Sequence, residues 1–552
     1  MSRNAAQKLV DVLIAQGVER VFCVPGESYL SVLDALYEAR GRIETIVCRH
    51  EAAAANMAEA TGKLTGRPGV AFVTRGPGAC HAGIGVHTAQ QDSSPMILFI
   101  GQIARGDRER EAFQEVDYRA FFGPMTKWTA EIDEAERVPE LVERAFHVAM
   151  QGRMGPVALA LPEDMLVEAA DACVSARVEP VRSAPDADAI ARVGAILATV
   201  ELPMLVLGGS GWNGIGLAGL DAFLSKTRIP AALSFRRKDI LSNDHDCYVG
   251  DLGLGTNPKL LARLKSADLV IALGARLGEN PSQGYTLFSR EESVAKLVHI
   301  HPDPVELGRV WPVRVGLCAD VNLAAQALAG LDVGKSFDAW RVDARTDYEK
   351  FSAPIEVPAA VNLSHVFAYL NEALPADAIV ANDAGNFAAW LHRFYRHRAP
   401  HTQLGPTSGA MGYSLPAAIA AKLQWPERDV LCVVGDGGFM MNGNELATCV
   451  RHGVNVITLV VDNSGYGTIR MHQERNYPTR VHGTELSNPD FVTYARSFGV
   501  QAERVERTED FPTALQRARD ANAPALLHIV ADMEQIAPGQ SVSALRAQNA
   551  QR

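Results

Sequence analysis

The sequence predicts an α/β protein with three doubly wound parallel-sheet domains. Short runs rich in Val, Ile and Leu alternate with helical patterns along the chain, which is typical of parallel sheets covered by helices. The chain has 552 residues, too many for one ordinary core. Segments 166–188 and 334–358 have the composition of linkers and separate three blocks. We expect domains at residues 1–165, 189–333 and 359–552.

Composition favours a soluble globular protein of a reducing compartment. Apolar residues make up 47% of the chain and charged residues 21%. The formal net charge of −11 argues against a nucleic-acid or membrane partner. The eight cysteines are scattered and form no C-x-x-C pair, which predicts buried free thiols. No apolar run reaches the ~18 residues of a membrane span, and the start lacks the pattern of a signal peptide. We therefore expect a cytoplasmic protein.

The first block contains five expected strands. They are "VERVFCVPG", "IETIVCRH", "GVAFVTRGPG", "PMILFIGQ" and "PVALALPED". An alanine-rich helix, "EAAAANMAEATGKLTG", starts at Glu51 directly after the second strand. This alternation predicts a parallel sheet with connecting helices.

The second and third blocks continue the alternation. The second holds the strands "PMLVLGGSG", "ADLVIALGARLG" and "KLVHIHPDP". The third holds "DAIVANDAGNFAAW", the helix "LPAAIAAKLQ", the stretch "VVGDGGFMMNGNELATCVRHGVNVITLVVDNSGYG" and the strand "PALLHIVAD". The last residues, "QSVSALRAQNAQR", are polar, and we expect a mobile tail there.

Two successive strands of the third block end in polar side chains. One stops at Gly435-Asp436-Gly437 and the next at Asp462-Asn463. Ligands of parallel sheets bind outside the carboxyl ends of the strands, so neighbouring strands would bring Asp436 and Asn463 together. With a backbone carbonyl from the following turn, they offer the hard oxygen ligands that Mg²⁺ prefers. The glycines let the backbone approach a phosphate, and the N-terminus of a helix expected at "NELATCVRHG" favours an anion. The local chemistry predicts a metal-bridged diphosphate site.

An isolated G-D-G is more often only a turn between a strand and a helix. The sequence also lacks the G-K-[ST] that would make this turn a Walker A loop. The second strand, which ends in "DNSGYG", is the observation that favours a binding site.

G-D-G followed by Asn at the end of the next strand resembles the cofactor motif of thiamine diphosphate-dependent enzymes, in particular acetolactate synthase large subunits. The resemblance covers almost the whole chain. It implies a pyrimidine-binding, a central Rossmann-like and a diphosphate-binding domain. Further motifs occur in the family's order: "VPGES" (24–28), "CRHEAAAANMAEA" (48–60), "TRGPGA" (74–79), the segment 92–102 that ends in "PMILFIGQ", "FQEVD" (113–117) and "SGAMGYSLPAAIAA" (408–421).

The resemblance assigns Glu51 to the N1′ atom of the cofactor's aminopyrimidine. A carboxyl group there promotes the imino tautomer, whose nitrogen can take the proton from C2. Glu51 follows an apolar strand and opens an alanine-rich helix, so poor solvation would raise its pKa towards a useful range. The alternative is an ordinary acidic residue in the first turn of a helix.

The resemblance implies further cofactor and substrate contacts. Met411 matches the apolar residue that holds the cofactor's bent shape, although a core methionine is the alternative. Gly385 and Asn386 match the loop at the diphosphate, and Gln114 matches a loop near the reactive C2 atom. His81, His87 and His472 are weaker candidates, of which His81 is the best placed. The remaining implied cofactor contacts are Gly26, Gly435, Gly437, Gly438 and Tyr466.

Asp436 and Asn463 become the expected side-chain ligands of Mg²⁺, with the carbonyl of Gly465 as the third. In this family, the residue matched by Glu51 and the metal site come from different subunits. The resemblance therefore implies a homodimer or homotetramer with active sites at the subunit interface.

Two departures from the family leave the substrate open. Acetolactate synthases carry an Arg-Phe-Asp-Asp-Arg stretch near a bound FAD. Here "GARLGENPSQGY" (274–285) keeps Arg276 but not the acids, which puts FAD in doubt, although "LGGSGW" (207–212) and "SFRRKD" (234–239) still fit an adenine-nucleotide pocket. His472 stands where those enzymes usually have Trp in the pocket of the acceptor 2-oxo acid.

Three functions are compatible with these residues. The first is an acetolactate synthase-like enzyme, or another thiamine-dependent decarboxylase, carboligase or 2-hydroxyacyl lyase acting on small 2-oxo acids. The second is an FAD-dependent oxidase on the same scaffold. The third is a non-catalytic homologue, against which the presence of both Glu51 and Asp436 argues.

Overall fold

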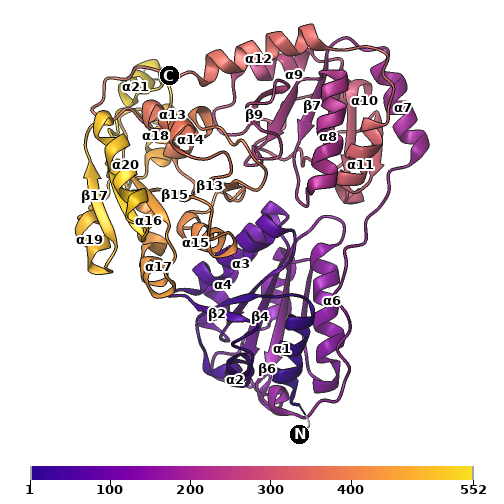
Figure 1. The fold of residues 1–552 in the computed structure, drawn as a ribbon, viewed down its shortest axis with the longest axis vertical. Coiled ribbons are helices and arrows are strands. Elements are labelled where there is room, and N and C mark those ends of the chain that lie inside the picture. The colour runs from indigo at the N-terminus through magenta and orange to yellow at the C-terminus, as the bar shows by residue number, and fades with distance from the viewer. Residues whose placement is uncertain (1–2, 550–552) are drawn as a thin grey trace.

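A computed structural model describes residues 3–549 and contains three sheets of six strands each (Figure 1). All pairings between the named strands are parallel. The predicted fold class, α/β with three doubly wound parallel sheets, is confirmed. No helix within the described residues is long and apolar enough to cross a membrane.

The N-terminal sheet has the strand order β2-β1-β3-β4-β6-β5. Alternate residues of β3 enter separate hydrophobic cores, one on each face of the sheet, as expected for a buried parallel sheet. The sequence predicted all of its strands except the edge strand β5, which is short and half-buried. The strands are β1 (Arg20–Cys23), β2 (Glu44–Val47), β3 (Gly69–Val73), β4 (Met96–Gln102), β5 (Trp128–Glu131) and β6 (Pro156–Pro162). The helices are α1 (Ala5–Ala15), α2 (Leu30–Glu38), α3 (Glu51–Thr65), α4 (Pro77–Asp92), α5 (Tyr118–Phe122) and α6 (Val138–Met150).

The central sheet has the order β12-β11-β10-β7-β8-β9. The three strands that the sequence predicted, β7, β10 and β11, lie side by side and are buried along their whole length. The strands are β7 (Pro203–Leu207), β8 (Ala231–Ser234), β9 (Tyr248–Leu252), β10 (Leu269–Leu273), β11 (Leu297–His301) and β12 (Val315–Cys318). The helices are α7 (Ala187–Leu197), α8 (Gly214–Thr227), α9 (Pro258–Ser266), α10 (Arg290–Lys296) and α11 (Val321–Ala329).

The C-terminal sheet, with the order β14-β13-β15-β16-β18-β17, repeats the order of the N-terminal sheet strand for strand. The sequence missed only its two edge strands. The strands are β13 (Ile379–Asn382), β14 (Gln403–Leu404), β15 (Val430–Gly435), β16 (Ile457–Asp462), β17 (Gln501–Val505) and β18 (Ala525–Val530). The helices are α13 (Leu363–Ala373), α14 (Asn386–Phe394), α15 (Ser414–Gln424), α16 (Asp436–Asn442), α17 (Leu446–His452), α18 (Gly467–Asn476), α19 (Phe491–Ser497), α20 (Phe511–Asp520) and α21 (Val542–Asn549).

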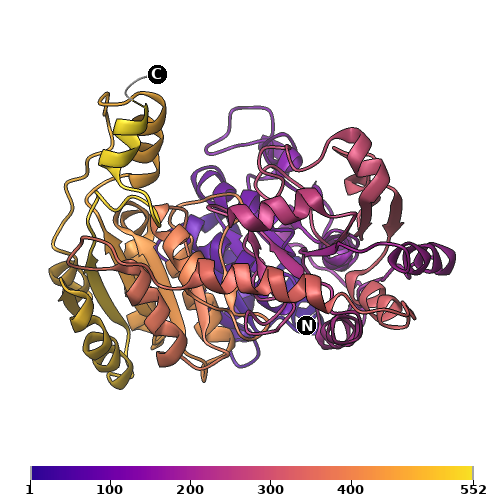
Figure 2. The ribbon, with the colours of Figure 1, turned by 90° about the horizontal axis from the view of Figure 1, so that it is seen from above.

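One of the two expected linkers differs from the sequence prediction. Segment 334–358, expected to be a linker, contains the helix α12 (Asp338–Ser352), which runs as a coral helix from the central sheet towards the C-terminal sheet (Figures 1 and 2). Its buried Ala344 and Tyr348 give it one apolar face, which its charged residues concealed in the sequence. Segment 166–188 has no helix or strand from 168 to 186, as expected of a linker. The predicted domain boundaries stay a prediction.

The expected mobile tail is also partly helical, and its residues after 549 lie outside the described part. Helix α21 packs on α18, with Val542 and Leu545 in a small core with Met471. Arg546 donates to both oxygens of Glu474 on α18, at 3.0 and 2.6 Å. The hydrogen bond from Arg546 is the largest of the effects that lower the pKa of Glu474 to about 2. A polar composition alone could not indicate this ion pair, in which the Glu474 side chain is buried.

The first and last sheets share one hydrophobic core. Helix α3 packs against α15 (Figure 1). Alanines of both helices, among them Ala58 and Ala417, are fully buried there. Small side chains let two helices approach closely, so the alanine-rich sequence of α3 serves this contact as well as helix formation.

A buried carboxylate, Asp92, joins all three parts of the chain. Its Oδ2 accepts from Lys63 at 2.5 Å, and its Oδ1 accepts from the backbone N–H of Thr407 at 2.6 Å. Its backbone carbonyl accepts from Arg237 and from the Ser210 hydroxyl of the central segment. Burial alone would raise the pKa of Asp92, but Lys63 and Arg237 hold it below its usual value.

A second buried acid, Glu59, connects α3 to the C-terminal segment. It is fully buried and accepts hydrogen bonds from the hydroxyls of Ser94 and Tyr413, both at 2.6 Å. Burial, reinforced by the nearby charge of Asp92, raises its pKa from 4.5 to about 7, although Lys63 acts in the opposite direction. The folded protein therefore holds a proton on Glu59 that the unfolded chain releases at lower pH.

This difference in protonation predicts that the contribution of Glu59 to the free energy of unfolding decreases as pH rises. Between pH 4.5 and about 7 the folded state binds more protons than the unfolded state, so the free energy of unfolding falls with pH. Relative to Glu59→Gln, the wild type should lose about 2 kcal/mol between pH 5 and pH 8. Chemical denaturation of both proteins at the two pH values measures this loss. Equal pH dependence in the two proteins would contradict the assignment.

Candidate active site

The carboxyl edge of the C-terminal sheet gathers several of the predicted site residues. Strands β13 and β15 are neighbours at the point where the strand order reverses, which is where open parallel sheets bind ligands. Gly385 follows β13 and Gly435 ends β15. The ring of Phe387 lies so close to both that a Cβ atom on either glycine would stand within 2.5 and 3.1 Å of it. The two predicted turns therefore meet. Gly385 has φ +154°, a conformation that favours glycine.

Asp436 lies beside the turn that contains the other predicted metal ligands. Its Oδ2 accepts from the backbone N–H of Gly465 at 3.1 Å. Asn463 lies in the same turn and approaches Gly467. A Cβ atom added to Gly467 would lie 2.9 Å from the side-chain nitrogen of Asn463. The carbonyl of Gly465 accepts from Gly467 N at 2.9 Å and keeps a second lone pair. The structure thus brings one carboxylate, one amide and one carbonyl to the same corner.

Two residues that the sequence reasoning missed support this corner. Asn488 donates to Oδ2 of Asp436 at 2.8 Å and to Oδ1 of Asp462 at 3.0 Å. His528 pairs with the other oxygen of Asp462 at 2.9 Å. Asn488 lies in an irregular loop and His528 inside β18, so no local pattern marks either of them.

The electrostatics of this corner suit a cation. Burial, with Asp462 nearby, raises the pKa of Asp436 to about 6, against the effect of the hydrogen bond from Asn488. Burial would also raise the pKa of Asp462, but His528 and the amide of Ser464 hold it below its usual value. Two carboxylates thus share one partner, Asn488, and a divalent cation would supply the missing positive charge. The donor set matches the oxygen ligands that Mg²⁺ takes in proteins.

The first turn of α16 leaves no room for side chains. A Cβ atom at Gly437 would lie 2.8 Å from the ring of Tyr466, and one at Gly438 would lie 2.5 Å from Oδ2 of Asp383. Backbone is therefore the only surface offered at these two positions. The helix expected at "NELATCVRHG" is α17, but a separate short helix that the sequence did not predict, α16, starts at Asp436 and has the glycines in its first turn.

Met411 is held by a carboxylate that the sequence reasoning also missed. Asp383 accepts from the backbone N–H groups of Gly412 at 2.6 Å and of Ser414 at 2.5 Å, just after Met411. Asn442 of α16 donates to the carbonyl of Gly412 at 2.5 Å. Burial raises the pKa of Asp383 to about 6, although these hydrogen bonds act against that rise. Asp383 and Asn442 thus fix the backbone directly after the half-buried Met411.

Asn386 contacts α18, and His472 is part of that helix. The side chain of Asn386 accepts from the Thr468 hydroxyl at 2.9 Å, which ties the turn after β13 to this helix. His472 is exposed on α18. His87 is half-buried on α4, apart from this edge.

A second group of predicted residues gathers at the carboxyl edge of the N-terminal sheet. Gly26 follows β1, and a Cβ atom there would lie 2.4 Å from Thr74 at the end of β3. Gln114 has φ +67° and lies against Gly76, which precedes α4. Glu51 opens α3, and its side chain is 13% exposed. These residues surround the first turn of α4.

The two groups are not joined within one chain. Among the contacts of residues 3–549, none links Glu51 to Asp436. Apolar side chains are exposed near both groups. Met440 and Met441 of α16 are 47% and 48% exposed, and Phe113, beside Gln114, is 73% exposed.

The central sheet has a cavity of its own. A cavity of about 380 Å³ lies at its carboxyl edge, next to the N-terminal segment. The predicted glycine cluster "LGGSGW" contributes to its wall, together with Arg153 and Asp320. The cations of "SFRRKD" do not line it. Arg236 and Lys238 are buried and donate to backbone carbonyls of the C-terminal segment, and Arg237 donates to the carbonyl of Asp92.

Arg276, the residue retained from the FAD stretch, also has a protein partner. It donates to the carbonyl of Gln91 at 3.0 Å and lies 3.4 Å from the buried Glu306. Arg153 and Arg309 approach the same carboxylate at 3.4 and 3.3 Å. The cavity can take a polar ligand. However, the residues that would distinguish FAD from another nucleotide are absent or already paired.

Comparison with known proteins identifies the three segments. Residues 3–121 match the N-terminal TPP binding domain of thiamine pyrophosphate enzymes, residues 190–328 the central domain and residues 383–529 the C-terminal TPP binding domain. The chain is 32% identical over 537 residues to the acetolactate synthase isozyme 2 large subunit of Escherichia coli, covering 96% of each chain. It is 30% identical over 546 residues to the acetolactate synthase of Bacillus subtilis, covering 96% of this chain and 94% of the relative.

The raised pKa of Asp436 predicts that binding of Mg²⁺ weakens at acid pH. Below about pH 6 the cation must displace a proton from this carboxyl, whereas above pH 7 the carboxylate is free. Calorimetric titration with Mg²⁺ from pH 5 to pH 8, with thiamine diphosphate present, measures the change.

Asp436→Asn is the control for this experiment. It should bind Mg²⁺ at least about tenfold more weakly at pH 8 and show only the pH dependence that the cofactor's phosphate contributes. The same pH dependence in the variant and the wild type would exclude Asp436 as the titrating ligand.

Proposed function

The chain belongs to the thiamine pyrophosphate enzyme family, and we propose on this basis that it makes and breaks C–C bonds of small 2-oxo acids with thiamine diphosphate and Mg²⁺. The observation that carries the proposal is the corner formed by Asp436 and the turn from Asn463 to Gly465. This corner lies at the strand-order reversal of a sheet within the matched C-terminal TPP binding domain.

The residues around the corner have complementary roles in this proposal. Asp436, Asn463 and the Gly465 carbonyl hold Mg²⁺, and the backbones of Gly437 and Gly438 face the diphosphate. Other cofactor contacts come from Gly26, Gly385, Asn386, Met411, Gly435 and Tyr466. When bound, thiamine diphosphate would supply a C2 carbanion that adds to the carbonyl carbon of the substrate. It would then take up the electron pair of the C–C bond that breaks. The supporting observation is that Gly437 and Gly438 present only backbone in the first turn of α16.

Glu51 is the proposed acid–base residue. It lies at the start of α3 and is largely shielded from water, which suits a carboxyl that exchanges a proton with a ring nitrogen. Gln114 lies on the neighbouring loop, beside the first turn of α4, and is the proposed contact for the substrate near C2.

We propose acetolactate formation as the reaction: pyruvate loses CO₂, and the two-carbon unit passes to a second 2-oxo acid. The full-length similarity to acetolactate synthases supports this choice. The exposed His472 on α18 makes the acceptor side more polar than a Trp would. That feature supports the second candidate, another thiamine-dependent decarboxylase, carboligase or 2-hydroxyacyl lyase. FAD is not required by either candidate, and Arg276 is already paired with Glu306.

We propose a homodimer or homotetramer in which Glu51 of one subunit completes the site of another. Two observations support an interface there: Glu51 has no contact with Asp436 in its own chain, and the methionines of α16 are exposed beside the metal corner. Covering such apolar side chains is a common function of subunit interfaces.

The proposal predicts that the purified protein releases CO₂ and forms acetolactate from pyruvate in equal amounts when thiamine diphosphate and Mg²⁺ are present. Glu51→Gln should lower kcat by about 10²- to 10⁴-fold, because it removes the proton donor and keeps the side chain's shape. Both products are measured together by a coupled CO₂ assay and a colorimetric acetolactate assay.

Two other results would revise the proposal. If pyruvate is inert but other 2-oxo acids or acyl-CoA substrates react, the second candidate replaces acetolactate formation. If calorimetry detects no binding of thiamine diphosphate, the assignment of Asp436 and Asn463 is wrong.

A further inference from the structure

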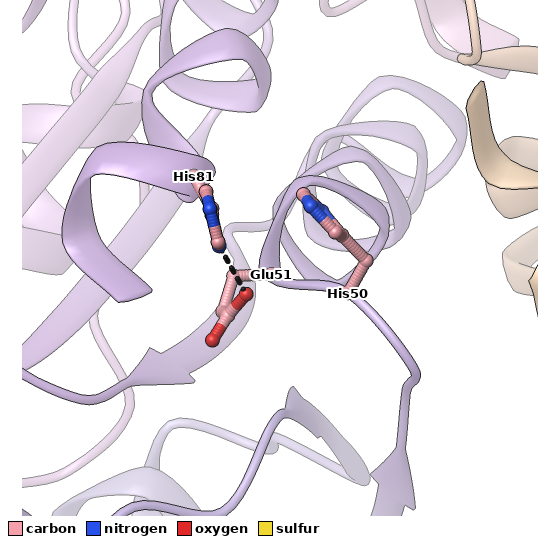
Figure 3. A group of neighbouring side chains, drawn as sticks. All are labelled: His50, Glu51 and His81. Carbon is pink, nitrogen blue, oxygen red and sulfur yellow. Dashed lines mark hydrogen bonds and ion pairs between the residues drawn. The ribbon is translucent and has the colours of Figure 1, made fainter. Parts of the chain in front are cut away.

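Glu51 has a hydrogen-bond partner that its proposed role does not explain. His81 of α4 lies with its Nδ1 atom 2.9 Å from Oε2 of Glu51 (Figure 3). Glu51 is the first residue of α3 and His81 the fifth residue of α4, and the two helices pack closely on one another. The Glu51 side chain is 13% exposed and that of His81 is 52% exposed. The imidazole therefore lies on the solvent side of the carboxyl.

The surroundings determine which nitrogen of each histidine carries its proton. When Glu51 is ionised its carboxylate only accepts, so the hydrogen bond then requires His81 to donate from Nδ1. His50 precedes Glu51, and its Nδ1 accepts from the backbone N–H of Ala52 at 3.1 Å, which places the His50 proton on Nε2. The two rings stack with their centres 4.5 Å apart and an angle of 29° between their planes. His50 thereby supports the face of the His81 ring.

The two oxygens of Glu51 have different environments. Oε2 accepts from His81, while Oε1 has no hydrogen bond from any residue of the described range 3–549. A Cβ atom at Gly78 would lie 3.3 Å from Oε1, so the glycine keeps the space beside this oxygen open. Oε1 is the oxygen left for a ligand. The hydrogen bond between His81 and Oε2 limits rotation of the carboxyl group and leaves Oε1 unbonded.

We propose that His81 is a positioning residue that holds Oε2 of Glu51 through its Nδ1–H group and so directs Oε1 towards the aminopyrimidine of the cofactor. This inference rests on the proposed role of Glu51 and adds to it. A carboxyl that rotates freely would spend part of its time with neither oxygen aligned with the ligand nitrogen. The hydrogen bond from His81 to Oε2 removes that freedom before the cofactor binds.

The same three side chains, His50, Glu51 and His81, have the composition of a metal site, because one ligand atom of each lies within 4.8 Å of the others. The hydrogen bonds argue against this use. The Nδ1 lone pair of His50 caps α3, and the Nδ1 proton of His81 faces the carboxylate. Burial and the neighbouring His81 lower the pKa of His50, so His50 stays neutral and adds no competing charge.

Two substitutions at residue 81 separate positioning from mere packing. In His81→Asn, the amide nitrogen takes approximately the place of Nδ1 and can still donate to Glu51. In His81→Leu, the side chain has similar bulk but no donor. His87→Leu on the same helix, where the structure gives the side chain no contact with Glu51, is the matched control.

The rate of hydrogen–deuterium exchange at C2 of thiamine diphosphate bound with Mg²⁺ tests the proposal without any substrate. Quenched-flow NMR of the full-length protein measures this rate. His81→Leu should slow the exchange about 10- to 100-fold, the loss expected for a hydrogen bond to a charged group. His81→Asn should stay within about threefold of the wild type, and His87→Leu should not change it. Equal rates for His81→Leu and the wild type would overturn the proposal, as would equal slowing in His81→Leu and His81→Asn.

A second measurement needs no cofactor. Solid-state ¹⁵N NMR of the histidine-labelled protein, with His81→Asn to assign the signal, reports which nitrogen of His81 carries the proton. We expect the Nδ1–H form in the wild type and a change to Nε2–H in Glu51→Ala. An Nε2–H form in the wild type would overturn the proposal. If the wild type neither binds thiamine diphosphate nor accelerates exchange, the proposed function fails instead, while the NMR result still decides the hydrogen bond.

Discussion

The buried carboxylate of Asp92 is the interaction on which the arrangement of the three sheets depends. It ends α4, whose first turn lies beside Glu51, and it binds Lys63 of α3, Thr407 near the Met411 loop and, through its carbonyl, Arg237 of the central segment. A buried charge is stable only when it is paired and hydrogen-bonded, so these partners cannot separate without a large cost. The relative placement of the three segments is therefore specified by chemistry as well as by apolar contact.

The repeated strand order gives the two ends of the chain equivalent ligand-binding edges. In each terminal sheet the order reverses between the first and third strands, and glycines at that point replace side chains that would fill the space. Gly26 does this in the first sheet, and Gly385 and Gly435 do it in the last. Each edge carries only part of the proposed chemistry, an acid with a neighbouring imidazole in one case and a cation corner in the other. In the proposed homodimer or homotetramer, two such edges of different subunits face one another to form one site.

The sequence predicted the central strands except β8 and missed most edge strands, and the edge strands were missed for a physical reason. Strands such as β10 and β15 are buried on both faces and appear as continuous apolar runs, whereas β12 alternates and β14 has only two residues. Asp436 and the turn at Asn463 were predictable because each directly follows such a strand. Asp383, Asn488 and His528 act through contacts between distant segments, and the pairing of Glu51 with His81 depends on how α3 packs on α4. No local pattern encodes these contacts.

The packing of α21 on α18 has a consequence for the order in which the protein folds during synthesis. The N-terminal sheet is complete once residue 162 has been synthesised, so its fold can form early, as domains generally do on the ribosome. The metal corner cannot mature at that stage. Asp462 meets His528 only when β18 has been added, and α18 is held only when Arg546 reaches Glu474. The part of the molecule that would hold the cation is thus the last to become rigid. A nascent chain that stalls late in synthesis would contain nearly every residue of the protein and yet lack a finished ligand-binding edge.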